Sequence, residues 1–121
     1  MIIVDTSMWM DQIRGLPTPL DELFGRGLIA LHPFVLGELM LGGLPKASKF
    51  AVDLNDLPEA PVASAKEVAA FITWAKMAGT GLGYVDTHLL VSAKLMPGGS
   101  ILSQDKNLLA QAKRLGLAYL P

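Results

Sequence analysis

The sequence predicts an α/β domain in which helices cover both faces of a short, mainly parallel sheet. Short apolar runs at residues 2–4, 28–31 and 101–102 have the continuous hydrophobic character of strands buried on both sides. These runs alternate with segments of helical spacing that end at glycine or proline. Because helical crossovers join parallel strands, we expect a three-layer α/β/α arrangement with four to five strands.

The first half of the chain predicts two strands and four helices. After the strand at residues 2–4, we expect helices at 8–14 and 19–25, a strand at 28–31, and helices at 33–41 and 46–55. Leu20, Leu23 and Phe24 have the spacing of one helix face. Pro33 is well placed to open the helix at 33–41, because proline suits the first helical position.

The second half begins with an edge strand at residues 60–63, because Pro61 lacks a ladder donor and excludes a central position. Ser64 and Glu67 form a capping-box pattern, so a helix is expected from 64 to about 77. A glycine-rich loop at 79–83 precedes a helix at 86–95. A strand at 100–103, a helix from Asp105 to 115 and a last strand at 117–120 complete the pattern.

Composition narrows the classes of function. The 121 residues are 51% hydrophobic and 17% charged with a formal charge of −1, so we expect one domain and no global field that attracts nucleic acid. The absence of cysteine excludes disulfides and thiolate metal sites. Neither a signal-peptide pattern nor a long apolar span is present, so we expect a soluble, cytoplasmic protein with no membrane contact.

Four acidic residues share a position relative to the predicted elements. Asp5 and Asp105 follow strands, Asp86 begins a helix after the glycine-rich loop, and Glu38 lies in the helix after the second strand. Strand carboxyl ends and helix amino ends converge on one edge of a doubly wound sheet. Carboxylates gathered there would repel one another unless protons or cations intervened. Mg²⁺ or Mn²⁺ suits such oxygen ligands, and these ions bind phosphate oxygens and activate water.

Each of these residues also has a structural interpretation. Asp5 could cap the following helix, Asp86 and Asp105 could complement helix dipoles, and Glu38 could be solvated. Thr6, Ser7 and Ser103 are residue types that commonly cap helices. His88 is expected to pack rather than to bind metal, and His32 could line the site or serve structure.

Other functions remain open on the residues alone. A Mg²⁺-dependent phosphatase of the aspartyl-phosphate type would have a second Asp two residues after Asp5, where this chain has Ser7. A catalytically inactive interaction module would have no reason to retain mutually repelling acids. The glycines at 79–83 follow a helix rather than a strand, so a dinucleotide cradle is weakly supported.

Four segments, at residues 2–9, 32–39, 81–90 and 102–108, together carry a family pattern. In them the chain resembles the PIN-domain ribonucleases, specifically the VapC-type toxins of bacterial toxin–antitoxin pairs. The resemblance spans nearly the whole chain and implies a single PIN-like nuclease domain at residues 1–121. It implies a Mg²⁺- or Mn²⁺-dependent endoribonuclease that cuts RNA such as tRNA.

The resemblance also assigns residues and partners. It implies that Asp5, Glu38, Asp86 and Asp105 are the catalytic, metal-binding acids, and that Thr6 and Ser103 support them by hydrogen bonding. Asn107 stands where some relatives have a further acid, which weakens the case for a second metal. A homodimer and a VapB-type antitoxin are implied as well. Apolar residues suited to a partner groove are Trp9, Leu39, Met40, Leu41, Phe50 and Leu54.

Overall fold

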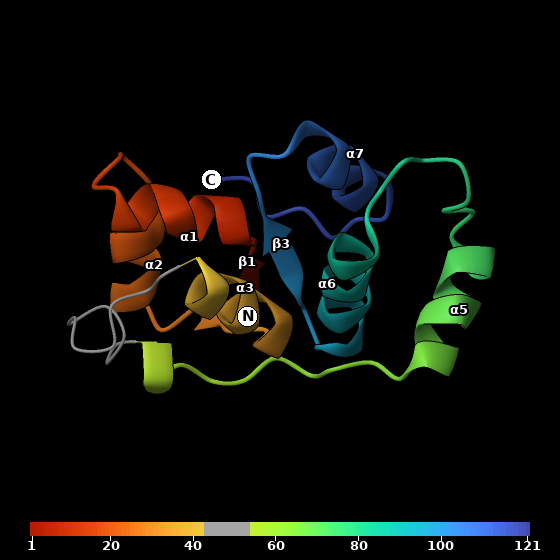
Figure 1. Ribbon diagram of the computed structural model, residues 1–121, viewed down its shortest axis with the longest axis horizontal. Helices are drawn as coiled ribbons and strands as arrows, with labels where there is room; N and C mark the ends of the chain where they lie inside the picture. Colours follow the sequence, from red (N-terminus) through yellow and green to blue (C-terminus); the bar gives the residue numbers. More distant parts are fainter. Residues whose placement is uncertain (43–53) are drawn as a thin grey trace.

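A parallel three-stranded sheet forms the centre of the described structure, a computed structural model that describes residues 1–42 and 54–121 (Figure 1). Strand β1 (Ile2–Val4) lies between β2 (Ile29–Ala30) and β3 (Ser100–Leu102). Ile3 is paired with Ala30 on one side and with Ile101 on the other. Because β1 is central and flanked on both sides, its apolar run is fully buried, as its sequence predicted.

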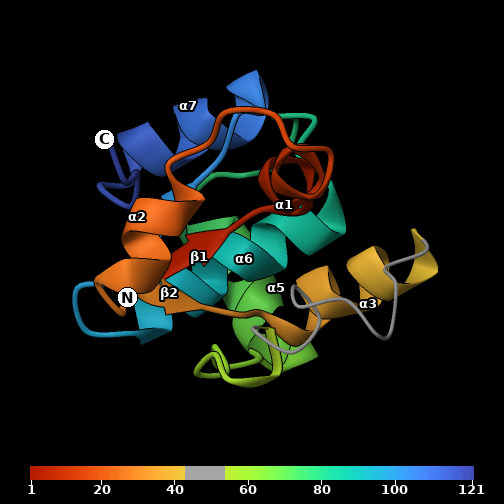
Figure 2. The ribbon, with the colours of Figure 1, turned by 90° about the vertical axis from the view of Figure 1, so that its left-hand side faces the viewer.

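Helices lie on both sides of this sheet, in agreement with the predicted layers. Figure 1 shows α1 (Thr6–Ile13) and α2 (Leu20–Gly25) on one side of β1 and β3, and α6 (Tyr84–Leu95) on the other. Figure 2 looks from the side of α1 and α2, so that α6 lies behind the sheet in that view. Helix α5 (Ala65–Trp74) packs on the outer face of α6, so α6 is enclosed and buries seven consecutive residues from Thr87 to Ala93.

Two further helices complete the part of the chain that the structure describes. Helix α3 (Pro33–Leu41) contacts α1, and α7 (Lys106–Arg114) contacts β3. Pro33 is the first residue of α3, as predicted, and the side chain of His32 accepts a hydrogen bond from the Phe34 N–H at 3.0 Å. Within the described residues, no helix is both long enough and apolar enough to cross a membrane.

The capping box predicted at Ser64 is present. Ser64 Oγ accepts from the Glu67 N–H at 3.1 Å, and Glu67 Oε1 accepts from the Ser64 N–H at 2.9 Å. The pKa of Glu67 is lowered from its ordinary value because these hydrogen bonds favour the charged form. The helix that follows is shorter than expected, since it ends at Trp74 and Lys76 adopts a left-handed φ of 53°.

The prediction of four to five strands is wrong for the described residues, in which the sheet has three. Segment 60–63 is not a strand. The Leu31 N–H donates to Pro58 O and the Ala60 N–H donates to Leu31 O, both at 2.8 Å, giving one isolated bridge between Leu31 and Glu59. The next donor in a parallel ladder is two residues after Leu31, at Pro33, which has no N–H and already begins α3, so the pairing is not extended.

The last predicted strand, at residues 117–120, is also reduced to a single bridge, between Ile101 and Ala118. Its two hydrogen bonds both involve Ile101, which donates to Leu117 O at 2.7 Å and accepts from the Tyr119 N–H at 2.8 Å. Pairing stops there, and Leu120 is exposed. The chain therefore touches the free edge of β3 without forming a regular strand.

Helix boundaries differ modestly from the sequence prediction. Helix α1 begins at Thr6 rather than at residue 8, and α6 begins at Tyr84 rather than at Asp86. The predicted helix at 46–55 lies mostly outside the described residues, as does Phe50; Leu54 and Asn55 are helical. The early starts place Thr6 in the first turn of α1 and Asp86 within the first turn of α6, at the helix ends near the predicted site.

Candidate functional site

Asp5 lies at the carboxyl end of β1, where the backbone leaves the sheet. Its N–H donates to Leu102 O of β3 at 3.1 Å, which holds the two strand ends together. Its Oδ1 accepts hydrogen bonds from the Met8 N–H at 3.1 Å and from Ser7 Oγ at 3.0 Å. Asp5 thus caps α1, as its structural interpretation predicted, and only 5% of the residue is exposed.

Ser103 connects Asp5 to Asp105. Its hydroxyl donates to Oδ2 of Asp5 and accepts from the Asp105 N–H at 2.9 Å. Asp105 caps α7, with Oδ1 accepting from the Leu108 N–H at 2.8 Å. Since β1 and β3 are adjacent and parallel, the residues after both strands emerge at the same edge of the sheet. Asp5 and Asp105 therefore share one side-chain hydroxyl.

Glu38 reaches this edge from α3. The hydroxyl of Thr6, in the first turn of α1, donates to Glu38 Oε1 at 3.0 Å. The contact between α1 and α3 brings these residues together although they are 32 positions apart in sequence. Glu38 is thus held by a neutral donor, which orients the carboxylate without neutralising its charge.

Asp86 lies in the first turn of α6, whose N-cap is Gly83. The pKa of Asp86 is raised from 3.8 to about 6, first by burial and then by the negative charges of Asp105, Asp5 and Glu38. Like charges raise a carboxyl pKa only when they are within electrostatic reach through protein of low dielectric. The charges of the other three predicted acids are thus within electrostatic reach of Asp86.

Asp5, Glu38 and Asp105 accept hydrogen bonds from hydroxyl or backbone N–H donors. None of the four acids has a cationic partner within the described ranges, where the one ion pair joins Arg26 to Glu22. In the arrangement that the described side chains adopt, no three His, Asp or Glu residues are close enough to form a ready metal-binding group. The donor chemistry nevertheless fits a hard divalent cation, because all four groups are carboxylates with unbalanced negative charge.

Asn107 supports the loop that leads to Asp86. Its Nδ2 donates to Thr80 O at 3.0 Å, and Thr80 Oγ1 donates to Met77 O at 2.8 Å. An amide at this position therefore ties α7 to the glycine-rich segment before α6. No sequence pattern indicates this role, since the partner of Asn107 is a backbone carbonyl 27 residues away.

The two histidines are buried, and the expectation that His88 packs in the protein is confirmed. The pKa of His32 is lowered from 6.5 to about 4 by burial and by His88, and burial also lowers the pKa of His88. Both rings are therefore neutral at pH 7. The Phe34 ring lies between them, with ring centroids 4.9 Å from His32 and 4.7 Å from His88.

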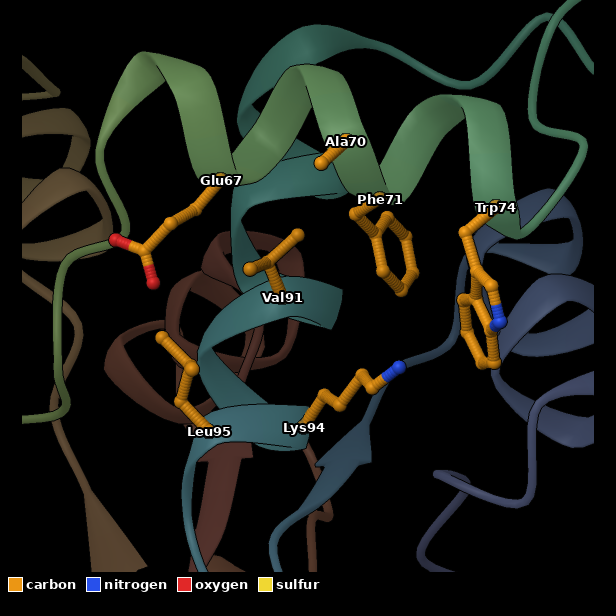
Figure 3. Close-up of a pocket in the computed structure, with 7 residues that line it drawn as sticks. All are labelled: Glu67, Ala70, Phe71, Trp74, Val91, Lys94 and Leu95. Atoms are coloured by element: carbon orange, nitrogen blue, oxygen red, sulfur yellow. The ribbon is translucent and has the colours of Figure 1, made fainter.

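A separate cavity lies between α5 and α6, away from the four acids (Figure 3). Its volume is about 370 Å³, and it is mostly apolar. Lys94 Nζ lies 3.3 Å from the centroid of the Trp74 ring, within cation–π distance. The lining residues are Glu67, Ala70, Phe71, Trp74, Val91, Lys94 and Leu95. None of the four acids lines this cavity, so it is distinct from the predicted site.

The fold and the site together define a parallel α/β domain with a cluster of acids at the carboxyl edge of its sheet. No family model matches the chain. The chain is 36% identical over 118 residues to Ribonuclease VapC32 of Mycobacterium tuberculosis, in strains CDC 1551 / Oshkosh and ATCC 25618 / H37Rv. The match covers 98% of this chain and 95% of each relative. The chain belongs to the family of VapC-type PIN-domain ribonucleases.

Proposed function

We propose that this protein is a Mg²⁺- or Mn²⁺-dependent endoribonuclease and the toxin of a toxin–antitoxin pair. The observation that carries the proposal is the hydroxyl of Ser103, which joins Asp5 and Asp105 at the carboxyl edge of the sheet in a chain 36% identical to a VapC ribonuclease. The pKa of Asp86, raised by burial and then by the other three acids, agrees with it. A cluster of like charges destabilises the folded state unless a bound cation neutralises it, so such clusters are typical of functional sites. The name of the relative, a VapC ribonuclease, supports RNA as the substrate.

Asp5, Glu38, Asp86 and Asp105 would hold the cation. When bound, a divalent ion lowers the pKa of water and stabilises negative charge on a phosphoryl oxygen. The protein groups supply orientation: Asp5 is fixed by Met8, Ser7 and Ser103, and Glu38 is fixed by Thr6. Fixed carboxylates lose little conformational freedom on binding an ion, which favours a defined geometry. The acids alone would repel RNA, so cation and substrate binding are expected to be coupled.

The sharpest test uses Asp86→Asn, because Asp86 is not the N-cap of its helix whereas Asp5 and Asp105 are N-caps. We expect this variant to fold and to lose metal-dependent cleavage of RNA by at least about 100-fold, since one anionic ligand is lost. Asp56→Asn, which changes an exposed acid in a turn, is the matched control and should cleave like the wild type.

Cleavage should require Mg²⁺ or Mn²⁺ and stop on addition of a chelator. Cleavage by Asp86→Asn at the wild-type rate would contradict the assigned site. Turnover of a phosphate monoester instead of RNA would favour the phosphatase alternative, and no turnover with either substrate would favour an inactive module. A panel that includes tRNA would test whether the RNA cut is of that class.

The proposed partners are a VapB-type antitoxin and a second copy of the chain, in the cytoplasm. The structure narrows the apolar surface suggested for the antitoxin. Trp9, Leu39 and Leu54 are buried in the core, so they form no free surface. Met40 and Leu41 are 61% and 90% exposed at the end of α3 and remain available. Co-purification with the antitoxin should weaken in Leu41→Glu, whereas RNA cleavage by the isolated protein should not change.

A further inference from the structure

Tyr84 is unusually exposed for a residue of α6. This helix is the most enclosed of the described helices, yet 55% of Tyr84 is accessible at its first position. With more than half of its surface in water, Tyr84 contributes only part of the burial that a large aromatic side chain can give to a core. Its position calls for an explanation other than packing.

The Tyr84 ring is nevertheless held in a defined orientation. It forms an edge-to-face contact with His88, one helical turn later, with ring centroids 4.7 Å apart and planes at 83°. His88 is only 4% exposed and packs in turn on Phe34 at 4.7 Å. A perpendicular contact covers at most one face of the tyrosine ring, so His88 leaves the other face uncovered. Tyr84 is thus a braced aromatic surface.

The ring is carried by the same end of α6 as Asp86. Tyr84 precedes Asp86 by two residues in the same first turn of α6. Phe34, which supports His88, precedes Glu38 by one helical turn on α3. The side chain is accessible from solvent, since 55% of Tyr84 is exposed. A flat group could therefore approach Tyr84 while the chain attached to it passes the acids.

We infer that Tyr84 is a stacking platform for an unpaired base of the RNA strand whose phosphodiester lies at the four acids. This inference rests on the proposed nuclease function. Unpaired bases of single-stranded RNA are characteristically recognised by stacking on aromatic side chains. Stacking needs no base-specific hydrogen bonds, so Tyr84 positions the strand and contributes to the preference for single-stranded over double-stranded RNA. Tyr84 is a substrate-positioning residue and takes no part in the chemistry.

The test compares Tyr84→Leu with Tyr84→Phe. Leucine keeps apolar contact with His88 but has no flat ring, whereas phenylalanine keeps the ring. For a single-stranded RNA oligonucleotide in Mn²⁺, we expect Tyr84→Leu to raise KM and the binding Kd about 10-fold, with kcat changed much less. Tyr84→Phe should remain within about twofold of the wild type. Trp74→Ala, which removes another strongly exposed aromatic residue, is the control and should also match the wild type.

Abasic residues provide a second measurement that does not depend on the stability of the variants. They are introduced one at a time along the oligonucleotide, and each binding Kd is measured. In the wild type, one abasic position should weaken binding about as much as Tyr84→Leu does. In Tyr84→Leu, the same abasic position should cause little further loss, because the two partners of one contact are then both absent.

Three results would overturn the inference: wild-type affinity in Tyr84→Leu, an equal loss in Trp74→Ala, or additive losses at every abasic position. A Tyr84→Leu variant that binds RNA normally but no longer binds the antitoxin would assign the ring to a protein partner and would also overturn it. Failure of the proposed nuclease function can be distinguished from failure of this inference about Tyr84. In that case the wild type would not cleave RNA in Mn²⁺, and the Asp86→Asn variant would be indistinguishable from it.

Discussion

The hydroxyl of Ser103 donates a hydrogen bond to the buried carboxylate of Asp5, 98 residues earlier in the chain. The same oxygen accepts from the N–H of Asp105 at 2.9 Å. One hydroxyl thus orients one acid and fixes the backbone of another. The pairing of β1 with β3 brings Ser103 to this position, because Val4 and Leu102 are partners in register.

Removal of this hydroxyl should affect both stability and the site. Ser103→Ala leaves one oxygen of Asp5 without its buried donor, so we expect the free energy of unfolding to fall by about 1–3 kcal/mol. RNA cleavage should fall more than the loss of folded protein explains, since Asp5 is no longer fixed. Denaturant unfolding and metal-dependent cleavage measure the two effects.

Ser103→Thr is the matched control, because threonine keeps the hydroxyl. Both stability and cleavage should stay near the wild-type values in this variant. Full cleavage activity in Ser103→Ala would show that the hydroxyl has no supporting role at the site.

The position of the acids could be predicted from sequence to different degrees. Asp5 and Asp105 follow apolar runs, and the rule that parallel strands end at one edge is enough to bring them together. Glu38 lies inside the helix after the second strand, so the pattern brings it toward the same edge, but its final position depends on how α3 packs against α1. Nothing in the sequence alone indicates that Thr6 would meet it.

The errors have physical causes of the same kind. Whether segments 60–63 and 117–120 become strands depends on how many backbone hydrogen bonds they form with the neighbouring strand. In each region, the hydrogen bonds toward the sheet go to one residue only, Leu31 in the first case and Ile101 in the second. The predicted helix began at Asp86, so Tyr84 was not placed in α6. Its exposure and its contact with His88 are tertiary features that hydrophobic periodicity does not report.

The raised pKa of Asp86 predicts how stability depends on pH in the metal-free protein. Its folded-state pKa of about 6 lies above the ordinary 3.8, so the folded state binds this proton more tightly than the unfolded state. The contribution of Asp86 to stability is therefore greatest below about pH 4 and decreases as the pH rises to about 6. Asp86→Asn should remove this dependence and raise the free energy of unfolding near pH 7 by about 1 kcal/mol, after allowance for solvent screening.

Measurement of unfolding at several pH values in the presence of a chelator, for the wild type and Asp86→Asn, isolates this contribution. The difference between the two proteins should be largest above pH 6 and should shrink toward pH 4. A variant less stable than the wild type at pH 7 would mean that Asp86 makes a favourable interaction in the folded state that outweighs the repulsion.

Divalent cations should stabilise the wild type for the same electrostatic reason. Binding to the folded state alone raises stability by RT ln(1 + [L]/Kd), which is about 2.7 kcal/mol at 100 times the Kd. We therefore expect Mn²⁺ to raise Tm by several degrees at pH 7. The increase should be much smaller in Asp86→Asn. An equal increase in both proteins would place the bound ion elsewhere.

Thr6 offers a test of how Glu38 is oriented. Thr6→Val keeps the shape of the side chain but cannot donate to Glu38 Oε1. Thr6 is only partly buried, so stability should change by less than about 1 kcal/mol. Cleavage should fall because Glu38 is free to adopt other rotamers. Thr6→Ser should retain activity, and unchanged cleavage in Thr6→Val would separate Thr6 from the function of Glu38.

Asn107 tests whether the loop before α6 depends on an amide where some relatives have an acid. In Asn107→Asp, a carboxylate oxygen replaces the Nδ2 that donates to Thr80 O, so two acceptors face each other. We expect the metal-free variant to lose about 1–3 kcal/mol of stability. Asn107→Ala removes the hydrogen bond without adding charge and should lose less stability.

Because Asn107→Asp adds a carboxylate to an already acidic region, Mn²⁺ should reduce the difference in stability between Asn107→Asp and Asn107→Ala. Thermal unfolding with and without Mn²⁺ measures this change, and a gap that Mn²⁺ leaves unaltered would show that residue 107 lies beyond the influence of the bound ion.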